Sequence, residues 1–169
     1  VKVEELALQT DAALLSTTKD RGYLKFSEVV AGRASQEDVK FASVKDVGRA
    51  IEKLVRSYSD DASNLTDLCR STLIFSSPKG ILECLRLMQQ DPELKLLRIK
   101  NRMAVGYDAN KSLGYRDVNV NLCISNEETH SVSAMQHIME VILLPEPFAE
   151  LKSLSGHAAY VGYRNLRVE

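Results

Sequence analysis

The chain has 169 residues, of which 44% are hydrophobic and 27% are charged, a balance typical of one globular domain. This composition excludes a disordered or fibrous protein, and no apolar run approaches the roughly 20 residues that a membrane-spanning helix needs. The net charge of −1 gives no overall attraction to nucleic acid, so any anion site must come from a local group of cations.

The first 42 residues are expected to form an N-terminal helical region. Apolar residues at helix-like intervals, from Leu6 to Leu14, predict a helix over residues 3–18. The stretch that continues to about residue 37 contains Gly32 and few periodic apolar positions, which indicates a loop or an irregular helix. The chain begins at Val1 rather than Met, which is compatible with a processed product or a piece of a longer protein.

Two further helices and one strand are predicted in the middle of the chain. Helical spacing over residues 43–58 gives an apolar side formed by Val44, Val47, Ile51, Leu54 and Val55. A polar turn then leads to a short apolar strand over residues 68–75. Ser77 followed by Pro78 predicts the start of a helix that runs to about residue 90. Its expected inward residues are Ile81, Leu82, Leu85 and Met88.

The last third of the chain predicts three strands, over residues 94–103, 117–124 and 132–144. The middle one alternates apolar and polar residues between Val118 and Ile124, which is the period of a strand. A helix over residues 148–153 and a short one from His157 are expected to follow. Strands that neighbour each other late in the chain favour an α/β domain of the α+β type, with a mixed sheet flanked by helices.

Three cysteines, Cys69, Cys84 and Cys123, are widely spaced and lie in apolar runs. Their odd number and spacing favour reduced core residues in an intracellular protein, cytoplasmic or organellar. No spacing of cysteine and histidine indicates zinc.

A basic strand is the first candidate functional feature. Arg98, Lys100 and Arg102 alternate along one stretch, so a strand places all three on one face. Three neighbouring cations repel one another unless solvent or an anion opposes them, and a nucleoside triphosphate is one such anion. The alternative is a solvated edge strand whose basic side chains prevent edge-to-edge pairing.

A second candidate is the run Gly114-Tyr115-Arg116-Asp117, which follows a polar connection over residues 106–113. An exposed tyrosine at the mouth of a strand can stack on a base, although an ordinary aromatic at a strand start gives the same pattern. The glycine-rich phosphate-binding loops of common nucleotide-binding domains are absent. Any bound phosphate must therefore be held by lysine and arginine side chains.

The order of these pieces resembles the RelA/SpoT-like family. The matching residues are 67–70 (Asp-Leu-Cys-Arg), 100–102 (Lys-Asn-Arg), 114–121 (Gly-Tyr-Arg-Asp-Val-Asn-Val-Asn), 148–152 and 156–160. The resemblance covers residues 43–166 and is closest to the branch that reads Gly-Tyr-Arg-Asp. It implies a fold of the polymerase-β-like nucleotidyltransferase type, and the family's best-known activity is pyrophosphate transfer from ATP to the 3′ hydroxyl of GDP or GTP.

The resemblance also implies roles for particular residues. Asp67 and Glu140 would be the catalytic carboxylates that hold Mg²⁺, and Tyr115 would stack on the acceptor guanine. The nucleotide-binding set would be Lys53, Arg70, Lys100, Arg102, Tyr115, Arg116 and Asn119. Lys53 has Arg49 one helical turn away, so the pair would form a cationic patch.

Several departures from the family leave two main hypotheses open. Catalytic members carry an Arg-x-Lys element ahead of the helix before the acid, whereas the matching region here offers Lys40 without the arginine. Ile142 stands where the family has a glutamine two residues after the glutamate. Asn119 stands where the bacterial synthetases have a histidine, and Asn101 where an aspartate is common. The first hypothesis is an ATP-dependent transferase. The second is a degenerate, noncatalytic domain that binds nucleotide weakly, or binds only a protein partner, within a larger assembly. An unrelated α/β domain with similar motifs is the third reading.

Overall fold

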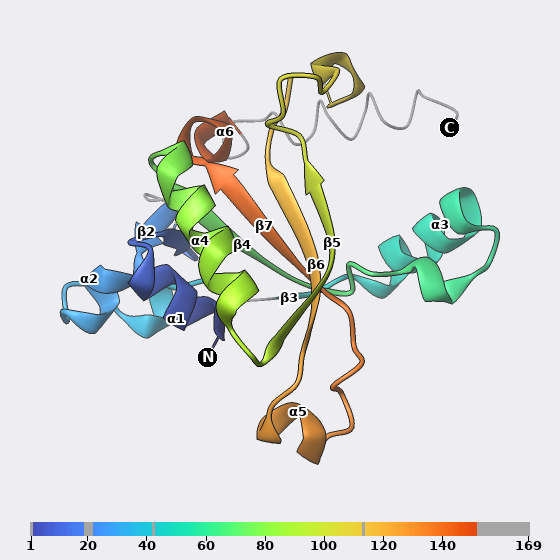
Figure 1. Ribbon diagram of the computed structural model, residues 1–169, viewed down its shortest axis with the longest axis horizontal. Coiled ribbons are helices and arrows are strands. Elements are labelled where there is room, and N and C mark those ends of the chain that lie inside the picture. Colours follow the sequence, from blue (N-terminus) through green and yellow to red (C-terminus); the bar gives the residue numbers. More distant parts are fainter. Residues whose placement is uncertain (1, 19–21, 42, 113, 152–169) are drawn as a thin grey trace.

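The computed structural model describes residues 2–18, 22–41, 43–112 and 114–151, and these form one seven-stranded mixed sheet with helices beside it (Figure 1). The helices are α1 (Lys2–Gln9), α2 (Phe26–Val30), α3 (Val47–Tyr58), α4 (Pro78–Gln90), α5 (Glu127–Ser131) and α6 (Glu146–Leu151), with short 3-10 turns η1 (Gln36–Asp38), η2 (Ala62–Asn64) and η3 (Ala109–Ser112). The strands are β1 (Ala13–Leu15), β2 (Tyr23–Lys25), β3 (Ser43–Val44), β4 (Cys69–Phe75), β5 (Leu94–Asn101), β6 (Val118–Ile124) and β7 (Met139–Pro145).

The strand order is β2-β1-β4-β7-β6-β5, and β3 pairs with the start of β4. β4 and β7 are parallel neighbours at the centre, while every other pairing in the described sheet is antiparallel. The expected mixed sheet of an α+β domain is confirmed. The three predicted late strands are β5, β6 and β7, but β7 begins at Met139 rather than at residue 132, because the chain leaves helix α5 at Val132 through turns in which Ser133 has a left-handed φ of 56°.

The main core lies between the sheet and the helices α1 and α4 (Figure 1). Ser77 caps α4 as predicted, with its side chain accepting from the Gly80 N–H at 3.4 Å. Ile81 and Met88 are buried, but the expected inward position of Leu82 is wrong because that side chain is half exposed. Cys84 takes its place, since it continues the helical spacing from Ile81. Cys84 and Cys123 are buried and Cys69 is half-buried, all three as free thiols.

The N-terminal region differs from the single helix expected over residues 3–18. α1 ends at Gln9, and Asp11 adopts a left-handed backbone with φ of 50°. The chain then turns into β1, where Ala13 and Leu14 pair with Ile74 and Leu73 of β4. Tertiary pairing with the central strand thus outweighs the helical spacing of the apolar residues.

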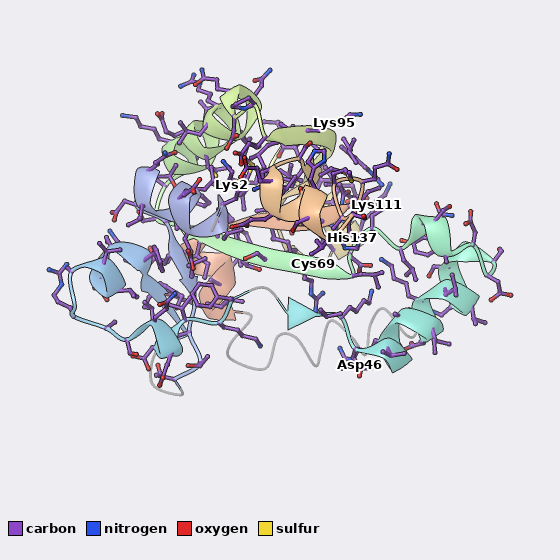
Figure 2. All side chains as sticks on the ribbon, turned by 90° about the horizontal axis from the view of Figure 1, so that it is seen from below. Lys2, Asp46, Cys69, Lys95, Lys111 and His137 are labelled. Carbon is purple, nitrogen blue, oxygen red and sulfur yellow. The ribbon has the colours of Figure 1, made fainter. Side chains whose placement is uncertain are left out.

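Helix α3 also departs from expectation. It begins at Val47, after Asp46 accepts a hydrogen bond from the Arg49 N–H at 3.1 Å, and not at residue 43. Figure 2 shows α3 extending away from the sheet, with Asp46 at its start. The predicted apolar side is largely exposed to solvent, with Val47 70% and Val55 63% accessible.

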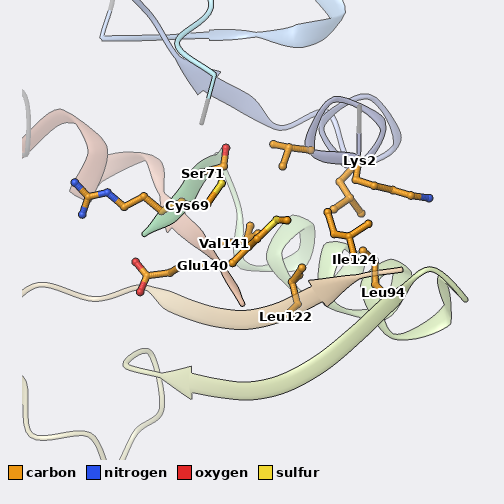
Figure 3. A pocket seen from close by; sticks show the side chains of 12 residues that line it. Lys2, Cys69, Ser71, Leu94, Leu122, Ile124, Glu140 and Val141 are labelled. Carbon is orange, nitrogen blue, oxygen red and sulfur yellow. The ribbon is translucent and has the colours of Figure 1, made fainter. Parts of the chain in front are cut away.

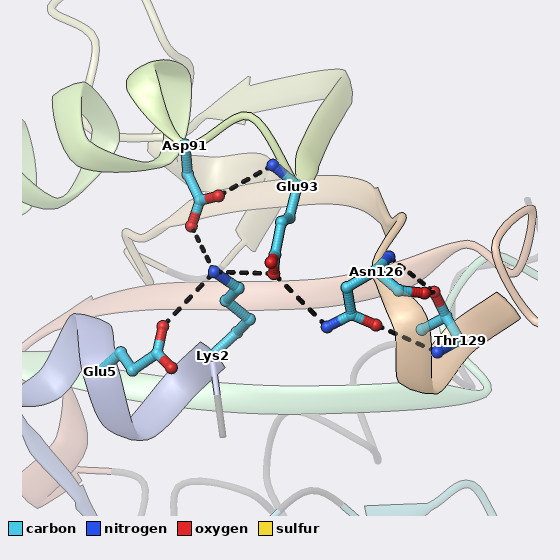
Figure 4. A network of polar contacts seen from close by, with 6 residues as sticks. All are labelled: Lys2, Glu5, Asp91, Glu93, Asn126 and Thr129. Atoms are coloured by element: carbon cyan, nitrogen blue, oxygen red, sulfur yellow. Dashed lines mark hydrogen bonds and ion pairs between the residues drawn. The ribbon is translucent and has the colours of Figure 1, made fainter. Parts of the chain in front are cut away.

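A polar network holds the start of α1 against the rest of the domain (Figure 4). Lys2 Nζ lies 2.9 Å from both Asp91 Oδ2 and Glu93 Oε2, and 3.4 Å from Glu5 Oε2. Hydrogen bonds to Glu93 and Asp91 raise the pKa of Lys2, so the amine stays charged and the helix stays fastened to the turn between α4 and β5.

At the other end of the described chain, α6 begins at Glu146 rather than at residue 148. Tyr23 of β2 donates a hydrogen bond to Glu146 at 2.5 Å, which ties the sheet edge to this helix. The resembling run at residues 156–160 and the helix expected from His157 lie outside the described residues. No helix within the described ranges has the length and apolar character needed to cross a membrane.

Candidate functional site

One face of the sheet carries polar side chains where the opposite face carries the main core. In β4 and β7, Arg70 and Glu140 alternate with core residues and lie side by side in register. Glu140 also pairs with Asn121 of β6, and β6 places Asn119 and Asn121 opposite Lys100 and Arg98 of β5. We call this set the polar face: Arg70, Arg98, Lys100, Asn119, Asn121 and Glu140.

The turn that contains Asp67 lies against the polar face. Asn121 donates a hydrogen bond from its side chain to the Thr66 carbonyl at 3.4 Å, which places the turn over the strand that neighbours Glu140. Asp67 is only 7% exposed, although it sits in a turn before β4. The two carboxylates of the sequence prediction therefore belong to one region of the sheet.

Two lysines share a single oxygen of Asp67. Lys45 Nζ lies 2.6 Å and Lys53 Nζ 3.0 Å from Asp67 Oδ2. Burial alone would raise the pKa of Asp67, but the hydrogen bonds from Lys45 and Lys53 outweigh it and lower that pKa. Burial likewise opposes a charged Lys53, yet hydrogen bonds to Tyr58 and Asp67 raise its pKa. Asp67 and Lys53 are therefore both charged near neutral pH.

The second oxygen of Asp67 has no such partner. Oδ1 is buried, and across the described residues it is the one buried side-chain nitrogen or oxygen without a hydrogen bond. A buried carboxylate oxygen without a partner is costly, so such atoms are rare in folded proteins. The carboxylate is therefore held in place through Oδ2, while Oδ1 is buried with its hydrogen-bonding capacity unused.

Lys45 was not predicted to be a site residue. The sequence predicted one continuous helix over residues 43–58, which includes Lys45, and it offered Lys40 as the lysine of the Arg-x-Lys element. Lys40 is exposed and lies beside β1. The signal was Asp46, a capping residue that places the helix start at Val47, two positions after Lys45. Pairing of β3 with β4 then brings Lys45 to Leu68, whose carbonyl accepts its backbone N–H at 2.8 Å. Two positions before Lys45 stands Ser43, so the arginine of the Arg-x-Lys element is missing in this register too.

Arg98 and Lys100 lie opposite Asn121 and Asn119 of β6, on one face of β5, whereas Arg102 follows the end of the strand. Burial and the neighbouring charges of Arg102 and Arg98 lower the pKa of Lys100. β5 is also an edge strand of the sheet. The polar face and the lysine pair together hold five cations, Lys45, Lys53, Arg70, Arg98 and Lys100, against the two carboxylates Asp67 and Glu140. The region has a local excess of positive charge in a chain of net charge −1.

Arg102 and Arg116 have protein partners in this structure. Arg102 Nη1 lies 2.5 Å from Oδ1 of Asp117, which is 2% exposed. Arg116 Nη1 donates to the carbonyls of Arg102 at 3.0 Å and Ala104 at 3.3 Å. These contacts fasten the loop before β6 to the end of β5.

Tyr115 lies on the same side of the sheet as Glu140, in a second, smaller apolar cluster. Its ring meets Phe148 of α6 edge to face, with centroids 6.0 Å apart. Gly114 precedes it with φ of +80°, a conformation that side chains with a Cβ rarely adopt. Ile142, at the position of the family glutamine, is buried in the same cluster.

A small apolar pocket borders the site on the other side of the sheet. It lies between α1 and the central strands, and Leu122, Ile124 and Val141 line it. Figure 3 shows the carboxylate of Glu140 at the rim of this pocket, away from Leu122 and Ile124. The polar chemistry therefore lies outside the pocket, on the open side of the sheet.

Among the described residues, no group of three or more histidine, cysteine, aspartate or glutamate side chains is arranged to hold a metal ion. Mg²⁺ needs fewer protein ligands, because it binds through one or two carboxylates and takes phosphate and water oxygens for the rest. The unpartnered Oδ1 of Asp67, together with Glu140 on the strand next to Asn121, offers two carboxylates of the kind that pattern requires.

Comparisons with known proteins identify the fold. No family model matches the sequence, and no curated protein matches it. Among solved structures, the small alarmone synthetase 1 of Bacillus subtilis bound to its product pppGpp is similar with a TM-score of 0.57 and 14% identity, over 71% of this chain and 61% of that one.

Two further structures agree. The small alarmone synthetase 2 of Bacillus subtilis has a TM-score of 0.55 and 17% identity, over 73% of this chain and 62% of that one. A GTP pyrophosphokinase family protein of Streptococcus pneumoniae has a TM-score of 0.53 and 12% identity, over 70% and 56%. This chain thus has a RelA/SpoT-like, nucleotidyltransferase-type fold, and it spans about 60% of the length of these structures.

Proposed function

We propose that this chain binds ATP on the polar face and transfers its pyrophosphate group, with Mg²⁺, to a guanine nucleotide or another hydroxyl acceptor. The observation that carries the proposal is the meeting of Asp67, Glu140 and five cations on one side of the sheet. The similar structures, which include a synthetase bound to pppGpp, support the same reading at the level of fold.

The electrostatics favour a polyanion. An excess of positive charge on a sheet face attracts a triphosphate and neutralises the charge that develops during transfer. Lys100 stands between Arg98 and Arg102 and is destabilised by their charges, so an anion placed there relieves the repulsion. Arg70 next to Glu140 adds a fork of donors suited to phosphate oxygens.

Asp67 and Glu140 are the residues that would hold the Mg²⁺. When bound, the ion would neutralise phosphate charge and orient the transferred group. Glu140 also lies beside Asn119 and Asn121, where a carboxylate can accept the proton of the acceptor hydroxyl. Tyr115 would offer its ring to the acceptor base from the adjoining apolar cluster.

The direct test is incubation of the purified chain with ATP, Mg²⁺ and GDP or GTP, scored for AMP by chromatography. Asp67→Asn and Glu140→Gln keep the shape of each side chain and should abolish AMP formation. Glu83→Gln, an exposed residue of α4, is the matched control and should retain it. Absence of AMP with every acceptor, together with absence of nucleotide binding by calorimetry, would overturn the proposal.

The second candidate is a noncatalytic module within a larger assembly. The exposed apolar side of α3, with Val47, Ile51 and Val55 all more than half accessible, favours it because such a stripe is typical of a surface for a protein partner. The commitment of Arg102 to Asp117 points the same way, since it removes one cation from the phosphate set. Nucleotide binding without AMP formation would select this candidate.

A further inference from the structure

We propose that Lys45 and Lys53 keep divalent cations off Asp67 until the phosphates of a bound nucleotide draw the two lysines away, so that metal and nucleotide bind with positive coupling. The inference rests on the proposed function and adds an order of events to it. Its basis is the unequal use of the two oxygens of Asp67.

Asp67 Oδ2 has both ammonium groups within hydrogen-bond distance, at 2.6 and 3.0 Å. Two positive charges on one carboxylate already exceed its single negative charge. A divalent cation on the remaining oxygen would stand beside both of them, and the repulsion is weakly screened because Asp67 is 93% buried, with 7% exposed. Metal alone is therefore disfavoured at the atom best placed to bind it.

The lysines are held where phosphates can reach them. Lys45 leaves β3 next to β4, and Lys53 projects from α3, with its ammonium group 5.1 Å from the centre of the Tyr58 ring. The side chain of Lys53 retains 31% exposure and that of Lys45 10%, so Lys53 is the more accessible to an incoming anion. A triphosphate offers both lysines stronger anionic partners than a shared carboxylate oxygen.

The buried, unpartnered Oδ1 is the second observation that points to a ligand. In a purely structural ion pair, both carboxylate oxygens are expected to be satisfied, since an orphaned oxygen is costly. Here Oδ2 accepts hydrogen bonds from two ammonium groups, and Oδ1 is buried without any partner. That asymmetry suits a carboxylate that exchanges ammonium partners for a metal ion during ligand binding.

The test is a titration of the nucleotide-free chain with Mn²⁺, with free Mn²⁺ measured by electron paramagnetic resonance. The Lys45→Met, Lys53→Met double variant should bind Mn²⁺ at least about tenfold more tightly than the natural chain, because two nearby positive charges are removed. Adding Asp67→Asn to the double variant should abolish the gain. Lys79→Met, an exposed lysine on α4, is the matched control and should leave Mn²⁺ affinity unchanged.

Equal Mn²⁺ affinity in the natural chain and the double variant would overturn the inference, as would a gain that survives Asp67→Asn. Circular dichroism checks folding. If the double variant is unfolded, the folded single variant Lys53→Met should show a smaller gain, and no gain would also overturn the inference.

The coupling has its own readout. Affinity for a non-hydrolysable ATP analogue should rise when Mg²⁺ replaces EDTA, and this rise should be lost in Asp67→Asn while binding in EDTA persists. An undiminished rise in Asp67→Asn would contradict the coupling. Because the Mn²⁺ titration contains no nucleotide, failure of the proposed function appears in the AMP assay, and failure of this inference appears in the titration.

Discussion

Two buried aspartates, Asp117 and Asp67, lie in two loops of the same sheet and have opposite surroundings. Asp117 faces Arg102, and its backbone carbonyl accepts the N–H of the same residue at 2.9 Å. Asp67 faces two lysines through one oxygen and leaves the other without a partner.

The difference separates a carboxylate that fastens a loop from one that we propose to bind a ligand. A closed one-to-one pair with added backbone bonds fixes the loop that begins at Gly114. Asp67 instead keeps one oxygen, Oδ1, without a hydrogen-bond partner, so its hydrogen-bonding capacity is not used within the described residues. Substitutions should therefore damage stability at Asp117 and activity at Asp67.

The largest effect is expected from Asp67→Asn on catalysis. Removing the charge should lower the rate of AMP formation by at least about a thousandfold, which corresponds to roughly 4 kcal/mol. The melting temperature should fall by less than in Asp117→Ala, because the amide keeps the size and a hydrogen-bond acceptor of the carboxylate and loses only its charge attraction to Lys45 and Lys53. A folded Asp67→Asn variant with unchanged AMP formation would show that this carboxylate has no catalytic role.

Asp117→Ala should act on stability. Breaking a buried ion pair leaves Arg102 without its partner and costs about 3 kcal/mol, or roughly 6–12 °C in melting temperature for a chain of this size. Thermal denaturation followed by circular dichroism measures the effect. If the melting temperature falls no further in Asp117→Ala than in Asp67→Asn, the two aspartates do not differ in their contribution to stability, and the prediction is wrong.

A smaller loss is expected for Arg116→Ala. The guanidinium donates to two backbone carbonyls at the end of β5, so its removal should cost about 1–2 kcal/mol of unfolding free energy. Arg33→Ala, an exposed arginine of the N-terminal region, is the control and should cost less than about 0.5 kcal/mol. Equal effects of the two substitutions would mean that Arg116 does not fasten the loop.

The smallest effect is expected in the loss of folding stability at low pH. The lowered pKa of Asp67 means that its contribution to stability is present above the unfolded value of about 4 and is lost as pH falls through the folded value. Asp61 and Asp91, with lowered pKa values of their own, act in the same direction. The loss of stability from pH 5 to pH 2 should thus be smaller in Asp67→Asn than in the natural chain. An identical acid profile would contradict the ion pairing at Asp67.

Local patterns were enough to predict much of the fold. The alternation in β6, the Ser77 cap of α4 and the mixed sheet are consequences of short-range spacing. β1 and the early end of α1 were not predictable in this way, because they depend on pairing with β4, about 60 residues along the chain. Helix α3 shows the converse error: its sequence has an amphipathic pattern, but within the part of the chain that the structure describes no element covers its apolar side.

The resemblance named Asp67, Glu140 and Lys100 as site residues, and these roles stay predictions. Register places Glu140 and Lys100 on one face of the sheet, and a hydrogen bond from Asn121 to the Thr66 carbonyl places the Asp67 turn beside them. Lys45 was not predicted because its position depends on β3 pairing with β4 and on Asp46 capping a helix that begins only at Val47. The partners of Arg102 and Tyr115 depend on loop packing that sequence spacing does not specify.

Calorimetric titration of the intact chain with a non-hydrolysable ATP analogue and Mg²⁺ tests most directly whether the polar face binds nucleotide phosphates. We expect one saturable site, weakened at least about tenfold by Lys100→Met, since a charge-assisted bond to phosphate contributes about 1.5–3 kcal/mol. Lys79→Met on the opposite side of the sheet should leave the affinity unchanged. Absence of binding, or equal losses from the two substitutions, would show that the polar face does not bind nucleotide phosphates.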